Sequence, residues 1–77
     1  MAQPNPAQDR VLVSGNLSAQ STYRLVDTRG RVWQEGPAAP VFRIDLQGMP
    51  PGLYVVMAWD PEQQISQTTR VVKTQRP

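Results

Sequence analysis

The stretch Val41-Phe42-Arg43-Ile44-Asp45-Leu46 decides the fold class, because apolar and charged side chains alternate along it. Successive side chains of a β-strand point to opposite faces of the sheet. The alternation therefore places Phe42, Ile44 and Leu46 in a core, and the two charged side chains between them in solvent. No stretch of the chain shows a convincing helical repeat, so the expected class is all-β.

Further apolar stretches on both sides of this strand are separated by turn-forming residues. The expected strands cover residues 10–14, 22–27, 31–35, 41–46, 53–59 and 65–74, and a seventh short strand could form near 16–20. Eight prolines and five glycines interrupt the chain, as expected of short strands joined by tight turns. Residues 53–59 are apolar on both faces, which predicts a central strand buried from two sides. The pattern predicts a small, Ig-like antiparallel β-sandwich of six to seven short strands.

The length of 77 residues fits one domain. Residues 9–77 are expected to form the sandwich and residues 1–8 a linker, because Pro4-Asn5-Pro6 favours an extended, unpaired path. A core of this size is thin and uncovered strand edges invite pairing, so a homodimer is an open expectation. Residues 1–8 are polar and contain no secretory signal, so an export signal of the parent protein is expected upstream.

The composition argues against an enzyme and against a metal site. The chain has no cysteine, no histidine and a single lysine, Lys73. A serine or threonine nucleophile would lack its usual base, and zinc its usual ligands. Seven arginines are scattered between acidic residues, for a net charge of +2, without the clustered basic face of a nucleic-acid-binding domain. We expect no catalysis, no cofactor, no metal and no nucleic acid.

Six positions that belong to the motifs described below also have a purely structural explanation. They are Asn5, Pro6, Asp27, Gly30, Gly52 and Tyr54. Asp27 and Gly30 fit a tight turn after residues 22–27, where the carboxylate bonds nearby backbone and the glycine takes a positive φ. Gly52 fits the turn before 53–59. Tyr54 fits a core aromatic whose hydroxyl bonds at the rim, and Asn5-Pro6 fits the entry to the first strand.

The order of these features resembles a known family. Asn5-Pro6 is followed by Tyr23-Arg24-Leu25-Val26-Asp27-Thr28-Arg29-Gly30-Arg31-Val32, by Ile44-Asp45-Leu46, by Met49-Pro50-Pro51-Gly52-Leu53-Tyr54-Val55-Val56 and by Thr69-Arg70-Val71-Val72-Lys73. Together they resemble the type A C-terminal sorting domain of type IX (Por) secretion system cargo in Bacteroidetes. The resemblance covers residues 5–73. Arg70 stands where many members carry lysine, and residues 74–77 extend beyond the expected final lysine.

The resemblance implies a folded export tag that is read at the outer membrane after its parent has reached the periplasm, on the way to the cell surface or the medium. The implied partners are the type IX translocon and its shuttle proteins, a sortase-like signal peptidase cutting near residues 1–8, and anionic lipopolysaccharide joined to the parent. The candidate recognition residues are Arg70, Val71, Val72 and Lys73, since a β-prone terminal strand can pair with a receptor strand. A solvated edge blunted by its cations explains the same residues without a receptor.

Two other functions fit the same fold. Some members of the family belong to the secretion machinery, stay uncleaved at the cell surface and are candidates for binding lipopolysaccharide. The other alternative is an accessory sandwich that binds carbohydrate or stabilises an adjacent enzyme. Carbohydrate platforms usually present a row of exposed aromatics, and the five aromatic residues of this chain, spread over several strands, do not obviously form one.

Overall fold

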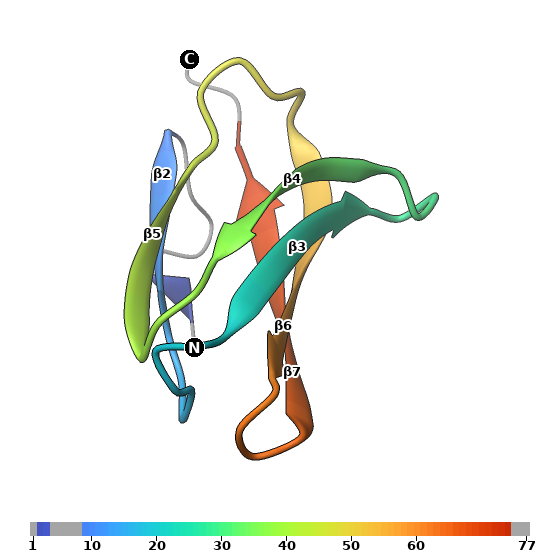
Figure 1. Cartoon of the computed structure of the whole chain (residues 1–77). Helices are drawn as coiled ribbons and strands as arrows, with labels where there is room; N and C mark the ends of the chain where they lie inside the picture. Colours follow the sequence, from blue (N-terminus) through green and yellow to red (C-terminus); the bar gives the residue numbers. More distant parts are fainter. Residues whose placement is uncertain (1, 4–8, 75–77) are drawn as a thin grey trace.

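Two antiparallel β-sheets packed against each other make up the described part of the computed structural model, residues 2–3 and 9–74 (Figure 1). The strands are β1 (Ala2–Gln3), β2 (Arg10–Ser14), β3 (Thr22–Asp27), β4 (Val32–Pro37), β5 (Val41–Asp45), β6 (Gly52–Asp60) and β7 (Ile65–Lys73). No helix occurs among the described residues. The predicted small all-β sandwich is confirmed.

The strand order is that of an Ig-like sandwich. The smaller sheet has three strands in the order β1-β2-β5, and the larger sheet has four in the order β4-β3-β6-β7. β6 lies between β3 and β7, and it pairs with β7 along its whole length, from Gly52 opposite Lys73 to Asp60 opposite Ile65. Strands β3, β6 and β7 correspond to the three-stranded sheet of an immunoglobulin constant domain. In this chain β4 is added beside β3 as a fourth strand.

The core lies between the two sheets and consists of alternate residues of the facing strands. Val11 of β2 and Ile44 of β5 meet Leu25 of β3, Val56 of β6 and Val71 of β7, and none of these five side chains is more than 1% exposed. Burying a side chain of this kind stabilises the fold by about 1.5–3 kcal/mol relative to leaving it exposed. Strands β3, β6 and β7 of the larger sheet therefore all contribute to one core.

The alternation that predicts β5 is confirmed in the structure. Ile44 and Leu46 are buried, and Phe42 is half-buried and packs against the core. Arg43 and Asp45 are exposed. The pattern succeeds here because polar side chains mark the outer face of the strand without ambiguity.

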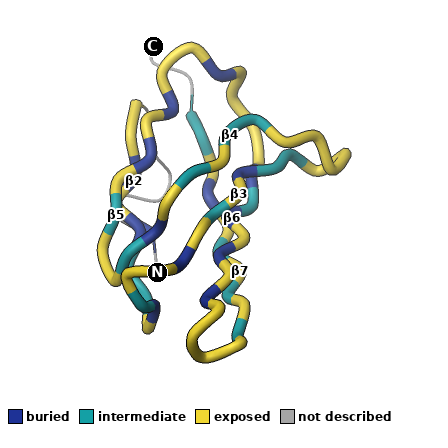
Figure 2. The backbone as a smooth tube through the Cα atoms, in the orientation of Figure 1, coloured by how far each residue is buried: buried dark blue, intermediate teal, exposed yellow. Residues whose placement is uncertain are grey.

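The prediction for β6 is wrong in one respect, because buried positions alternate with exposed or half-buried ones along most of the strand (Figure 2). Only one of its two faces is therefore buried. Val56 and Ala58 point into the core, whereas Leu53, Met57 and Trp59 are 37%, 49% and 46% exposed. The smaller sheet covers one face of the larger sheet, and the outer face of β6 remains apolar and open to solvent among the described residues.

The structure also corrects two predicted boundaries, the end of the 31–35 strand and the extent of the N-terminal linker. β4 continues through Gly36 and Pro37, which lie opposite Tyr23 and Thr22 of β3. The seventh strand is β1, inside the segment expected to be a linker, where Ala2 is buried against the core. β1 precedes the first proline, so both of its residues keep the N–H groups that a sheet requires. The rest of the expected linker, residues 1 and 4–8, lies outside the described residues.

A buried carboxylate connects the loop at residues 16–20 to the end of β6. Asp60 is fully buried, and it accepts hydrogen bonds from the Ser18 N–H at 2.9 Å and the Ser18 hydroxyl at 2.8 Å. The backbone N–H of Glu62, at 3.0 Å, and the side-chain amide of Gln63, at 2.6 Å, also donate to it. Residues 16–20 form bends and turns that bind this carboxylate, so the short strand expected there is absent.

Candidate recognition site

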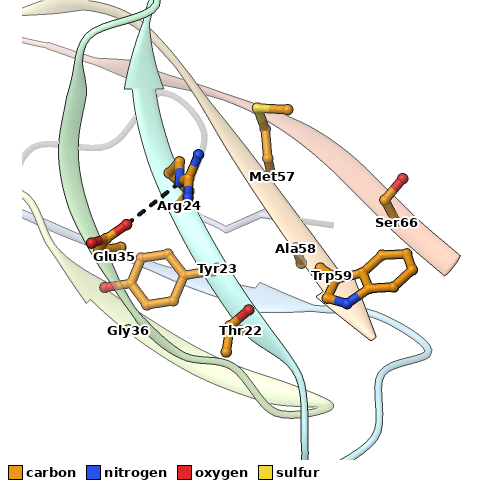
Figure 3. A pocket seen from close by; sticks show the side chains of 9 residues that line it. All are labelled: Thr22, Tyr23, Arg24, Glu35, Gly36, Met57, Ala58, Trp59 and Ser66. Carbon is orange, nitrogen blue, oxygen red and sulfur yellow. Dashed lines mark ion pairs between the residues drawn. The ribbon is translucent and has the colours of Figure 1, made fainter. Parts of the chain in front are cut away.

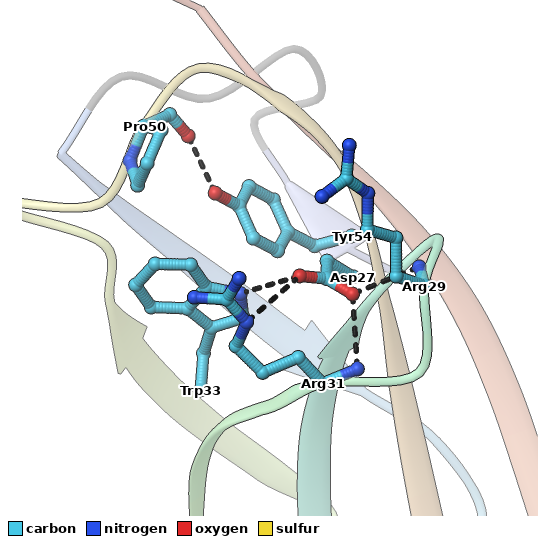
Figure 4. A network of polar contacts seen from close by, with 6 residues as sticks. All are labelled: Asp27, Arg29, Arg31, Trp33, Pro50 and Tyr54. Atoms are coloured by element: carbon cyan, nitrogen blue, oxygen red, sulfur yellow. Dashed lines mark hydrogen bonds and ion pairs between the residues drawn. The ribbon is translucent and has the colours of Figure 1, made fainter.

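Asp27, at the end of β3, organises the β3–β4 hairpin (Figure 4). Its Oδ1 accepts hydrogen bonds from the backbone N–H groups of Arg29 and Arg31, at 2.9 and 3.0 Å. Its Oδ2 accepts one from the indole N–H of Trp33, at 3.0 Å. Gly30 takes a φ of 85° in the same turn, a conformation that other residues adopt only with strain. Asp27 and Gly30 therefore form the tight turn that joins the two strands.

Trp33 connects this turn to the core. The hydrogen bond from the Trp33 indole is the largest reason that the pKa of Asp27 lies below its usual value, and the backbone donors add to the effect. The Trp33 ring meets Tyr54 edge to face, with centroids 6.2 Å apart. The Arg31 guanidinium lies 5.3 Å from the centre of the same indole, in a cation–π contact. Trp33 therefore contacts both charged residues of the turn, Asp27 and Arg31, and the core residue Tyr54.

Tyr54 fixes the start of β6. Its side chain is 4% exposed, and its hydroxyl donates a hydrogen bond to the carbonyl of Pro50 at 2.5 Å. Burial raises the pKa of Tyr54, so the hydroxyl stays protonated and remains a donor. Gly52, with a φ of 151°, allows the chain to turn into the strand. A tyrosine that bonds back to the backbone at this corner is a known device of Ig-like sandwiches.

The strand register places three of the six motif positions, Asp27, Gly52 and Tyr54, at one end of the larger sheet. Asp27 lies opposite Tyr54, and Tyr54 lies opposite Val71 of β7. Gly52 lies opposite Lys73. We call Asp27, Tyr54 and Val71, which lie side by side on β3, β6 and β7, the motif row; Val71 is one of the predicted recognition residues. Asn5 and Pro6, two further motif positions, lie outside the described residues.

The four predicted recognition residues end β7, the last strand in the order β4-β3-β6-β7. They have unequal surroundings. Val71 is fully buried in the core, so its side chain is part of the fold. Arg70 and Val72 are exposed and Lys73 is half-buried. Three of the four side chains can therefore meet a partner while the domain stays folded.

No group of three or more His, Cys, Asp or Glu residues that could hold a metal ion occurs among residues 2–3 and 9–74. Within the same residues, the chain has no helix long and apolar enough to cross a membrane.

Sequence reasoning missed two features of the structure, one buried and one on the surface. One is Asp60, whose partner Ser18 is 42 residues away along the chain, a distance over which no local pattern signals a contact. The other is a depression of about 630 Å³ on the outer face of the larger sheet, next to Met57 and Trp59 (Figure 3). An apolar run such as 53–59 does not tell which of its residues face outward.

The fold and the motif row define a small Ig-like β-module. The chain belongs to the family of secretion system C-terminal sorting domains, whose family model matches residues 2–74. No curated protein matches the chain. Membership of the family implies a sorting signal for type IX secretion, and with it an interaction with the type IX secretion machinery and export across the outer membrane to the cell surface or the medium.

Proposed function

We propose that this chain is a non-catalytic sorting domain, and that the type IX translocon and its shuttle proteins recognise the folded sandwich and carry the parent protein across the outer membrane. The family match over residues 2–74, which includes every strand of the sandwich, is the observation that carries the proposal. Asp27 and Tyr54 direct their polar groups into a turn and to the rim of the core. The motif therefore supports a shape rather than a reactive centre.

The contact surface in this proposal includes the end of β7. Arg70 lies opposite Val55 and Val72 lies opposite Leu53, so these side chains share the outer face of the larger sheet. A guanidinium next to exposed aliphatic side chains suits a receptor that offers acidic and apolar groups, since arginine is enriched in protein interfaces. Val71 contributes to recognition only by keeping this strand in place.

The proposal extends to processing of the parent protein. A sortase-like peptidase would cut near residues 1–8 and join the parent to anionic lipopolysaccharide. Mass spectrometry of the exported parent tests this step. A new carboxyl terminus close to residues 1–8 supports removal of the domain, whereas an intact chain through residue 77 contradicts it and favours a retained surface protein.

Sorting itself is tested by appending residues 1–77 to a periplasmic reporter with its own inner-membrane export signal. In a type IX-competent cell the reporter should reach the surface or the medium, and in a strain without the translocon it should stay in the periplasm. Retention in both strains would overturn the proposal.

The double variant Arg70→Ala, Val72→Ala tests the contact surface. Both side chains are exposed, so the fold should survive, while export should fall by about tenfold or more if they form a central contact. Thr68→Ala is the matched control, because Thr68 is exposed on the same strand and shares its face with Arg70. Thermal unfolding checks both variants. Equal export of the double variant and the control would remove this surface from the proposal.

A further inference from the structure

The depression on the outer face of the larger sheet combines two aromatic side chains, Tyr23 and Trp59, with several polar groups (Figure 3). Its volume of about 630 Å³ lies in the range of small-molecule sites. The residues used below are Thr22, Arg24, Glu35, Met57, Trp59 and Ser66, which come from β3, β4, β6 and β7 and all line it. The rigid sheet holds their backbone, so the arrangement exists before any ligand binds.

Trp59 is the apolar platform of the depression. Its side chain is 46% exposed, although it belongs to a strand whose other face forms the core. Among the described residues, the structure shows no hydrogen-bond partner for its indole N–H. Thr22 and Ser66 are its direct neighbours on the two flanking strands. The Trp59 ring therefore lies between the hydroxyl-bearing residues Thr22 and Ser66, and its own indole N–H is available to donate a hydrogen bond to a ligand.

Arg24 and Glu35 form the polar side of the depression. Arg24 lies opposite Met57 on β6 and opposite Glu35 on β4. The Arg24 Nε and Glu35 Oε2 are 3.5 Å apart, and the two side chains are 60% and 65% exposed. They are the two charged residues among those that line the depression, so its formal charge is zero. The pair offers N–H donors and carboxylate acceptors next to each other.

We propose that this depression binds a neutral sugar ring of an oligosaccharide. The C–H face of a sugar ring can stack on the indole of Trp59. The sugar hydroxyls can accept hydrogen bonds from Arg24, donate them to Glu35, and do both with the hydroxyls of Thr22 and Ser66. Because Arg24 and Glu35 are paired and their charges cancel, the depression gives neither an anionic nor a cationic ligand a net electrostatic advantage. A purely apolar ligand would desolvate the polar side without replacing its hydrogen bonds. This activity is independent of the sorting function.

The test is a titration of the ¹⁵N-labelled 77-residue chain with cellohexaose, maltohexaose and chitohexaose, followed by NMR. The chain has two tryptophans, and Trp33 donates its indole N–H to Asp27, so the Trp33 signal is an internal control. At least one of the three neutral hexasaccharides should shift the Trp59 indole signal at concentrations up to about 10 mM, a range that detects weak binding, while the Trp33 signal stays in place.

Trp59→Ala should weaken binding by about tenfold or more, as expected for the loss of a central aromatic contact. Leu53→Ala is the matched control: it shortens another exposed apolar side chain on the same face of β6 and should leave the affinity within about twofold. Hexagalacturonate, an anionic oligosaccharide, should bind more weakly than the best neutral one.

A Trp59 signal that moves with none of the neutral hexasaccharides overturns the proposal, as does tighter binding of hexagalacturonate or unchanged binding by Trp59→Ala. Export of the reporter separates this proposal from the sorting function. Trp59→Ala should be exported normally. If it instead stops export and the parent chain binds no sugar, the depression is a protein-docking surface and the sugar proposal is wrong.

Discussion

The buried polar side chains of this small domain differ in how many hydrogen-bond partners they have. Asp60 accepts several hydrogen bonds, and Tyr54 donates a single one to Pro50. The hydroxyl of Ser21 is buried without a partner in the described part of the chain. A buried polar group costs free energy when it lacks a partner. The individual hydrogen bonds of Tyr54 and Asp60 should therefore each contribute measurably to the free energy of unfolding.

Tyr54→Phe removes the hydroxyl that bonds to Pro50 and leaves the ring in place. The free energy of unfolding should fall by about 1 kcal/mol, the usual net value of one such hydrogen bond. Urea unfolding measures it. Tyr23→Phe is the control, since the Tyr23 hydroxyl lies 3.4 Å from Gln34 Oε1 in a half-buried position, and its loss should cost less than about 0.5 kcal/mol. Equal losses in the two variants would show that the Tyr54–Pro50 bond has no special role.

At the element scale, the sequence predicts a strand well when its outer face is polar. Residues 41–46 alternate cleanly, and β5 has the expected burial. Residues 53–59 are apolar on both faces, so the pattern could not reveal that Met57 and Trp59 lie in solvent. β1 is too short to carry a pattern at all. The Asp27–Gly30 turn follows from local chemistry, whereas the Asp60–Ser18 contact and the outer depression depend on strand register, which no single stretch encodes.

Asp60→Asn tests the connection between the 16–20 loop and β6. Burial tends to raise the pKa of Asp60, but the hydrogen bonds from Ser18 and Gln63 outweigh it and lower the pKa from 3.8 to about 2. A lowered folded-state pKa stabilises the fold above the unfolded-state pKa, and this stabilisation disappears as pH falls from about 4 toward 2. At neutral pH the variant should therefore unfold at lower urea concentration than the parent.

The difference in free energy of unfolding between the parent and Asp60→Asn should shrink as the pH falls from about 6 to 2. Urea titrations at several pH values measure it, and the other carboxylates cancel because both proteins contain them. A difference that stays constant over this range would mean that the charge of Asp60 is not what the loop recognises.

If the secretion machinery recognises the folded sandwich, as we propose, export of the parent protein depends on the stability of the entire domain. Leu25→Ala removes a fully buried side chain and should lower the free energy of unfolding by about 2–5 kcal/mol. Val41→Ala, at a 57% exposed position of β5, should cost less than about 1 kcal/mol.

Reporter export should fall with the folded fraction of Leu25→Ala and stay normal for Val41→Ala. Export of an unfolded Leu25→Ala domain at the parent's rate would show that a linear segment is read instead of the sandwich.

The position of Val71 in the core has a consequence for the timing of recognition. β7 is the last strand along the described chain, yet it supplies a fully buried side chain and one whole flank of β6. A polypeptide that ended before Ile65 would lack Val71, so the core would be exposed to solvent there, and β6 would have no partner strand on the edge that β7 occupies. A receptor that senses shape would thus pass over truncated translation products and accept molecules synthesised through Lys73, so the tag would also act as a check for completeness.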